Sequence, residues 1–101
     1  MVEINGQLFD WDREKNLRNI HKHGVSFKMA ASSFFDKDAK SLRDERHSQD
    51  EDRFILIGKN KIDNLLTVSH CYRDKRNIIR IISARKADIR ETNIYEGGED
   101  E

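Results

Sequence analysis

Residues 78–87 constrain the fold of this chain more than any other stretch. They read IIRIISARKA, with four isoleucines in the first five positions. Side chains branched at Cβ favour the extended backbone, so this dense apolar run predicts a buried strand. Arg80 interrupts the run and must either pair with a carboxylate or face a functional surface, because an unpaired buried charge is costly. We expect the strand to end near Ser83, where Arg85 and Lys86 add two further cations and form a plausible anion site.

The composition limits the chain to one small domain with a modest core. Of its 101 residues, 36% are hydrophobic and 38% are charged. The 19 basic and 19 acidic residues balance, but three of the acids are Glu99, Asp100 and Glu101. Without those three, 19 basic residues stand against 16 acidic ones, an excess of +3. Nucleic-acid binding would therefore depend on local clustering of cations rather than on net charge.

Cysteine usage and hydropathy predict a cytoplasmic location. The single cysteine, Cys71, excludes an internal disulfide and agrees with a reducing compartment. The N-terminus does not resemble a signal peptide, and no apolar run approaches the roughly 20 residues needed to cross a bilayer. The histidines and Cys71 do not form a recognised zinc-binding pattern, so we expect neither a metal site nor a cofactor.

The first third of the chain predicts a hairpin and two helices. Asn5-Gly6, between residues 2–4 and 7–9, is a strong signal for a two-residue hairpin turn, and residues 1–8 are expected to be an extra hairpin. Asp12 is a good N-cap for a helix that ends at His23, with Gly24 closing it in a left-handed conformation. Ser26 can cap a second helix that ends near Asp36.

The apolar period then changes to that of strands. Strands are expected at residues 39–43, 53–58, 65–72 and 78–83, separated by polar turns that include residues 46–52 and 73–77. Connections this short imply antiparallel pairing, since parallel strands need a long crossover. A final helix is expected at residues 86–95, followed by a disordered acidic tail at 97–101. The predicted fold is α+β, with two N-terminal helices on an antiparallel meander of about four strands and one domain over residues 1–96.

Several motifs, in this order, resemble the BrnT toxins, the ribonuclease half of the type II BrnT/BrnA toxin-antitoxin systems. They are FDWD at residues 9–12, KN at 15–16 with Asn19, KHGVSF at 22–27 and IRIISARKA at 79–87, together with the strand at 53–58. The resemblance covers roughly residues 9–95. It implies a RelE-like fold, with helices packed on one face of a small antiparallel sheet and a helix at the C-terminal end.

The resemblance also implies a metal-independent endoribonuclease that inhibits translation. Its expected partners are an RNA substrate and a BrnA-like ribbon-helix-helix antitoxin, through which the toxin-antitoxin complex binds promoter DNA; no membrane is expected. An alternative from a different class is a non-catalytic interaction module, whose basic groove binds only a peptide of the antitoxin.

Metal-free RNA cleavage needs a base, an acid and a cationic group that stabilises the extra charge on the phosphate. The resemblance assigns the cationic role to Arg80 and Arg85, because arginine binds phosphate through two parallel hydrogen bonds. These residues are five apart, so on a regular strand they would face opposite sides. Either the strand breaks by Ser83 or only one arginine faces the site. Either arginine could instead simply pair with an acid beneath a helix. Further substrate-binding candidates are Arg53, Arg73, Ser83 and Lys86.

Four more residues are candidates for catalysis. Glu51 is the candidate base because it matches the family's Glu-x-Arg pattern with Arg53, although a run such as Gln49-Asp50-Glu51-Asp52 is also typical of a solvated turn. His47 lies close to Glu51 in sequence and is the candidate acid, since an imidazole titrates near pH 6.5. Lys22 and His23 match the family's Lys-His-Gly motif, but cations at a helix C-terminus are favourable without any function.

Overall fold

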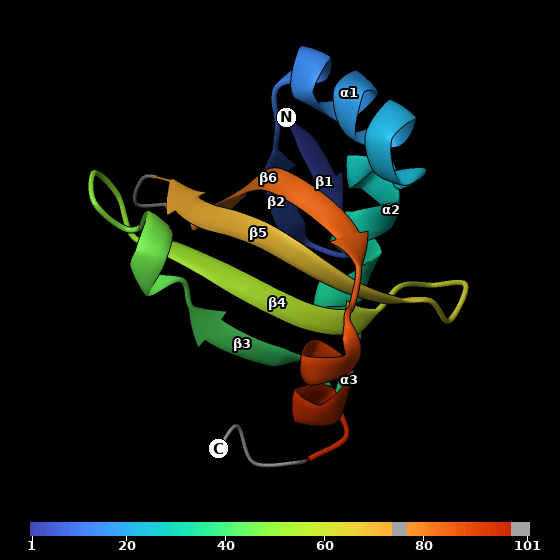
Figure 1. Cartoon of the computed structure of the whole chain (residues 1–101). Coiled ribbons are helices and arrows are strands. Elements are labelled where there is room, and N and C mark those ends of the chain that lie inside the picture. Colours follow the sequence, from blue (N-terminus) through green and yellow to red (C-terminus); the bar gives the residue numbers. More distant parts are fainter. Residues whose placement is uncertain (74–76, 98–101) are drawn as a thin grey trace.

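The structure, a computed structural model, describes residues 1–73 and 77–97. Six strands form one sheet: β1 (Val2–Ile4), β2 (Gln7–Asp10), β3 (Lys40–Arg43), β4 (Arg53–Lys59), β5 (Leu65–Arg73) and β6 (Ile78–Lys86). The helices are α1 (Arg13–His23), α2 (Phe27–Ala31) and α3 (Ile89–Tyr95), with 3₁₀ segments at Ser32–Phe35 and Glu45–His47. The α+β prediction is confirmed, and Figure 1 shows how these elements are arranged.

The sheet is mixed and has the strand order β1-β2-β6-β5-β4-β3. The predicted antiparallel meander is present as β3 to β6, and the N-terminal hairpin is present as β1 and β2. The prediction of about four strands, all antiparallel, is wrong because the hairpin joins the sheet. In β2, Phe9 pairs with Ile79 and Asp10 with Arg80, parallel to β6. The long segment between these two strands supplies the crossover that parallel pairing requires.

The two N-terminal helices begin where their caps predict. The side chain of Asp12 accepts a hydrogen bond from the Lys15 backbone, and α1 ends at Gly24 with φ of 69°. Ser26 caps α2 in the same way, through the Met29 backbone. The α-helical part of the second helix stops at Ala31, shorter than predicted, and continues as a 3₁₀ segment. The Ser32 hydroxyl donates to the Met29 carbonyl at 2.6 Å, a local bond that competes with regular helical geometry.

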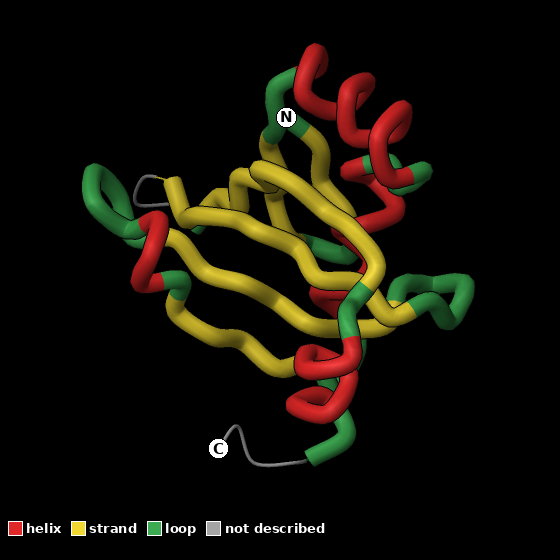
Figure 2. The backbone as a smooth tube through the Cα atoms, viewed as in Figure 1, coloured by secondary structure: helices red, strands yellow, loops and turns green. Residues whose placement is uncertain are grey.

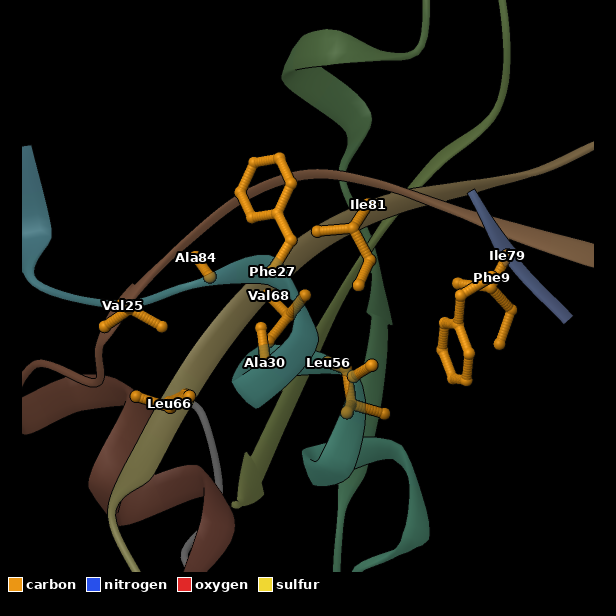
Figure 3. Packing of buried hydrophobic residues seen from close by; sticks show 11 residues of the cluster. Phe9, Val25, Phe27, Ala30, Leu56, Leu66, Val68, Ile79, Ile81 and Ala84 are labelled. Atoms are coloured by element: carbon orange, nitrogen blue, oxygen red, sulfur yellow. The ribbon is translucent and has the colours of Figure 1, made fainter. Parts of the chain in front are cut away.

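The hydrophobic core lies between α2 and one face of the sheet (Figure 3). Phe27 and Ala30 from α2 are fully buried against Val68 and Ile81 of the central strands. The buried side chain of Asn19 fastens α1 beside β6: its amide donates to the Ala84 carbonyl at 2.8 Å and its oxygen accepts from the Ala84 backbone at 3.1 Å. Asn19 thus holds α1 beside β6, while α2 covers the core face of the sheet.

The boundary between the last strand and the last helix differs from the prediction. The strand does not end near Ser83 but runs to Lys86, and α3 begins only at Ile89. The start of the helix is set by Asp88, which forms a reciprocal capping box with Glu91. Figure 2 shows the short loop that joins the two elements.

Two other predicted segments are only partly described. Arg73, expected in a turn, is the last residue of β5, and the rest of that turn at 74–76 lies outside the described residues. The predicted tail lies outside them as well, except for Gly97. Within the described part of the chain, no helix has the length and apolar character that a membrane crossing requires.

Candidate active site

The strand register defines an open sheet face, turned away from α2. On β5, Val68 and His70 are fully buried on the core side, so the alternating residues Thr67, Ser69 and Cys71 belong to the other face. Their partners on β6 are Arg85, Ser83 and Arg80, respectively. Three of the four predicted site residues of β6, namely Arg80, Ser83 and Arg85, therefore share the open face.

A β-bulge explains how Arg80 and Arg85 come to lie on one face. Ser69 pairs with Ser83, but the next residue, His70, pairs with Ile81. Ile82 is therefore an extra residue in β6, and one extra residue reverses the alternation of side chains beyond it. The predicted end of the strand near Ser83 is wrong, because the strand continues through the bulge to Lys86. Arg80 and Arg85 both lie on the open face, but of these two described residues only Arg85 lines the groove of that face.

Arg80 is paired with Asp10, a residue that the sequence analysis did not select. The Arg80 Nη1 atom lies 2.7 Å from the Asp10 Oδ2 atom, and Arg73 Nη1 lies 3.4 Å from the same oxygen. Asp10 reaches this position through the parallel pairing of β2 with β6. One carboxylate oxygen therefore holds two guanidinium groups at this end of the open face.

Arg85 is paired with Glu91 from α3, which covers the other end of the open face. Both Nη atoms of Arg85 donate to the two carboxylate oxygens of Glu91, each at 2.8 Å. Burial opposes ionisation of Glu91, whose side chain is 10% exposed, but hydrogen bonds from Arg85 and the Asp88 backbone outweigh it and lower its pKa. Arg85 therefore forms the pair that the sequence analysis gave as the alternative to a functional role, with an acidic side chain of a helix.

Of these arginines, Arg53 has the positive charge that a neighbouring carboxylate neutralises least. It lies opposite Cys71 on the open face, and its Nε atom is 3.6 Å from the Glu51 carboxylate. That Nε is buried, and within the described residues it has no hydrogen-bond partner. The side chain is 33% exposed, and within the described residues its Nη atoms form no hydrogen bond, so these atoms, unlike the buried Nε, can donate to a phosphate oxygen.

Two adjoining hollows contain half of the predicted site residues. A groove of about 600 Å³ runs along the open face, and its lining includes His47, Arg53, Ser83 and Arg85. A smaller hollow of about 330 Å³ is lined by His47, Gln49, Asp50, Glu51 and Arg53. His47 and Arg53 line both, so the structure brings the candidate acid, the candidate base and two arginines into one region.

His47 and Glu51 stand in different environments. His47 is 62% exposed, and its Nδ1 lies 2.9 Å from the Asp44 carboxylate, which fixes one side of the ring. Glu51 lies close to Cys71: burial raises the pKa of the Cys71 thiol, and the negative charge of Glu51 raises it further. The Glu51 side chain is 53% exposed, as in a solvated turn, and its carboxylate lies at the rim of the smaller hollow beside Arg53.

Five predicted residues line neither hollow: Arg80, although it lies on the open face, and the four that follow. Lys22 and His23 end α1, on the core side of the sheet, where the favourable interaction with the helix C-terminus accounts for both. Lys86 pairs with Leu66, which is buried, so it does not alternate onto the open face. Arg73 lies beside Asp10 at the far end of the sheet. None of the four is among the described residues that line the groove.

The sequence reasoning missed Asp10 and Glu91, the two carboxylates that hold the arginines of β6. The Asp88-x-x-Glu91 capping-box pattern could have located Glu91, whereas only the parallel pairing of β2 reveals Asp10. Across the described part of the chain, no group of three or more histidine, cysteine or acidic side chains is arranged to hold a metal ion.

Comparisons with known proteins agree with the geometry. A structure of the ribonuclease toxin BrnT from Brucella abortus matches with a TM-score of 0.58 and 23% sequence identity, over 81% of this chain and 97% of the Brucella chain. At that identity, the match supports the fold. A search of curated proteins finds no match. A family model, described as the ribonuclease toxin BrnT of type II toxin-antitoxin systems, matches residues 11–91. The chain therefore belongs to the BrnT family of ribonuclease toxins.

Proposed function

We propose that the chain is a metal-independent endoribonuclease whose active site is the groove on the open sheet face. The observation that carries this proposal is the position of Arg53, whose guanidinium has unused donor capacity between the candidate base and the candidate acid. Membership of a ribonuclease toxin family supports the same reaction class. Arg53 and Arg85 bind the scissile phosphate, and the Ser83 hydroxyl, exposed on the same face, adds a neutral hydrogen bond.

The proposed reaction is an attack of the RNA 2′-hydroxyl on the adjacent phosphorus. Glu51 removes the proton from the 2′-oxygen as the new bond to phosphorus forms. The bond from phosphorus to the 5′-oxygen then breaks, and His47 donates a proton to the leaving oxygen. The products are a 2′,3′-cyclic phosphate and a free 5′-hydroxyl. Arginine stabilises the pentacovalent phosphate because its charge persists at every relevant pH.

Arg80 and Arg73 act beside this centre in the proposal. Held by Asp10, they lie on the open face or at its end and extend the cationic surface along which the RNA backbone lies. Lys22, His23 and Lys86 take no part, because they lie away from the groove.

The proposed biological role follows from the family. Cleavage of RNA in the cytoplasm would inhibit translation, and a BrnA-like ribbon-helix-helix antitoxin would restrain the toxin and bind promoter DNA. This antitoxin is the protein partner that the proposal requires.

The decisive experiment incubates the purified chain, freed of partner, with unstructured RNA in EDTA. We expect fragments that end in a 2′,3′-cyclic phosphate. Arg53→Ala and Glu51→Ala should lower the cleavage rate at least about 100-fold while the circular dichroism spectrum is retained. Arg13→Ala removes one exposed cation from α1 and should leave the rate unchanged. Cleavage that persists in Arg53→Ala would refute the assigned site.

A second candidate function is the non-catalytic interaction module. One observation favours it: Arg80 and Arg85 are both already paired with carboxylates, as expected of a surface that is not adapted to phosphate. Intact RNA at high protein concentration, with retained antitoxin binding, would support this candidate over the enzyme.

A further inference from the structure

A second groove, of about 740 Å³, lies between the N-terminal hairpin, α2 and the turn that joins β4 to β5. We name it the lysine groove. Its lining combines the apolar side chains of Ile4, Met29 and Phe35 with the cations Lys28, Lys59 and Lys61. It shares no lining residue with the groove on the open face.

The acids of the lysine groove leave two of its cations uncompensated. Asp36 accepts hydrogen bonds from the Lys59 backbone at 2.7 Å and from the Tyr95 hydroxyl at 2.7 Å, so its charge is stabilised locally. Asp63 lies 3.7 Å from the Lys59 ammonium. Within the described residues, neither the Lys28 nor the Lys61 side chain forms an ion pair with these or other acids. The groove therefore presents positive charge to an incoming partner.

The apolar part of the groove is unusually accessible. Phe35 is 41% exposed, although a large aromatic side chain is favoured in the core. Its ring is not loose, because it packs edge-on against the fully buried Phe9 at a centroid distance of 6.1 Å. A fixed aromatic surface flanked by cations is typical of sites that bind a peptide with both apolar and acidic side chains.

We infer that the lysine groove binds an acidic, partly apolar segment of a protein partner, namely the antitoxin. This inference rests on the proposed function, which supplies that partner. A peptide suits the groove better than RNA does. It can place carboxylates over Lys28 and Lys61 and uncharged side chains over Asp36 and Asp63, whereas RNA carries a phosphate at every residue and would meet these aspartates.

One wall of the lysine groove belongs to the part of the chain outside the family match. Ile4 and Asn5 precede residue 11, where that match begins. Asn5 has φ of 49° and Gly6 has φ of 83°, as a tight hairpin turn requires, so the turn holds this wall in a defined conformation. The hairpin turn therefore gives the lysine groove a preformed wall.

The test measures the affinity of the full chain for the purified product of the reading frame adjacent to its gene. Lys28→Glu/Lys61→Glu should raise the dissociation constant about tenfold or more in isothermal titration calorimetry, because two attractive charges become repulsive. Arg13→Glu/Lys15→Glu makes the same charge change on exposed positions of α1 and should leave the affinity unchanged. The milder Lys28→Gln/Lys61→Gln pair should give a smaller loss and guards against misfolding of the first variant.

Three outcomes would overturn the inference. The first is that both lysine double variants bind the adjacent gene product with the wild-type dissociation constant. The second is that the wild-type chain does not bind that product at all. The third is that the lysine variants lose affinity only for a 2′-O-methyl RNA oligonucleotide, which would assign the groove to RNA. The rate of RNA cleavage is measured separately on the same proteins. An inactive wild-type chain would refute the proposed enzyme and leave the titration readable, whereas full activity with unchanged antitoxin affinity would refute only the lysine groove.

Discussion

Arg80 and Arg85 lie on the same face of β6, and each is paired with a carboxylate, yet the two pairs are built differently. Glu91 is six positions from Arg85 and is itself fixed by the α3 capping box. Asp10 is 70 positions from Arg80 and is fixed by the pairing of β2 with β6. The first pair is local and rigid, while the second depends on the whole sheet being assembled.

The two pairs also leave different donor capacity for a phosphate. Both Nη atoms of Arg85 are engaged by Glu91, so a phosphate can gain a bidentate contact only if that carboxylate is released. Arg80 uses Nη1 alone in its contact with Asp10 among the described residues, and its remaining donors can bind a phosphate while the pair persists. Arg80 can therefore bind the RNA backbone without losing Asp10. Arg85 can bind a phosphate through both Nη atoms only when the phosphate replaces Glu91.

The largest effect should follow from removal of the local pair. Glu91→Ala deletes the buried partner of Arg85 and half of the capping box, so we expect the free energy of unfolding to fall by about 2–3 kcal/mol. This is less than for a fully buried pair, because Arg85 is 44% exposed. Urea denaturation followed by circular dichroism measures the change. Glu91→Gln retains a hydrogen-bond acceptor and should lose less.

The stability difference between wild type and Glu91→Gln should depend on pH. The pKa of Glu91 is lowered in the folded chain from its ordinary value of 4.5. The unfolded chain therefore takes up a proton first, and the stabilisation is complete above that ordinary value and is lost as the pH falls below it. A difference that stays constant from neutral pH into the acid range would contradict the ion pair.

Removal of the long-range pair should have a smaller effect. Asp10→Ala leaves Arg80 and Arg73 without their shared carboxylate, but both arginines are part-exposed and water replaces the lost contact. We expect a loss of about 1 kcal/mol in the same urea assay, with Asp10→Asn intermediate. A loss of stability larger than that of Glu91→Ala would reverse the ranking of the two pairs. It would show that the fold depends more on the pair at the β2–β6 junction than on the pair with α3.

The same contrast explains what the sequence could predict. Local caps, turn residues and apolar alternation are enough to predict several elements. These are the helix starts at Asp12 and Ser26, the Asn5-Gly6 turn and the strands β3 to β5. The sequence does not predict that Arg80 and Arg85 lie on the same face. That arrangement depends on which residue of β6 lacks a partner on β5, and several neighbouring residues could have been the bulged one.

The candidate site divides along the same line. His47, Glu51 and Arg53 are close in sequence and lie together in the structure, so a local pattern was enough to group them. Lys22 and His23 match a motif, but no local property of a helix end says whether it faces the groove. Asp10 was overlooked because its role arises from a parallel pairing, and short turns alone favour antiparallel neighbours.

Deletion of Ile82 would sharpen the comparison by removing the bulge. In the observed register, Ile81 pairs with His70 and Ser83 with Ser69, so the shortened strand would pair continuously. Arg80 and Arg85 would remain on one face, and we expect a folded protein that is less stable by no more than about 1 kcal/mol. Insertion of an alanine after Ile82 reverses the alternation again and should be much more damaging. Equal damage from both changes would mean that the bulge is not at Ile82.

The smallest effect concerns the second attachment of α3, the hydrogen bond from the Tyr95 hydroxyl to Asp36 at 2.7 Å. This bond to a carboxylate raises the pKa of Tyr95 to about 12. A raised phenol pKa means that the stabilisation is complete below the ordinary value of 10.0 and is lost as the pH rises toward 12. Phenolate absorbance during an alkaline titration should show this late step in wild type, and Tyr95→Phe should lack it. Asp36→Asn should move the step to lower pH, because the negative charge that opposes ionisation is gone. If the step stays at its original pH in Asp36→Asn, α3 is held to the domain mainly through Glu91 and Arg85.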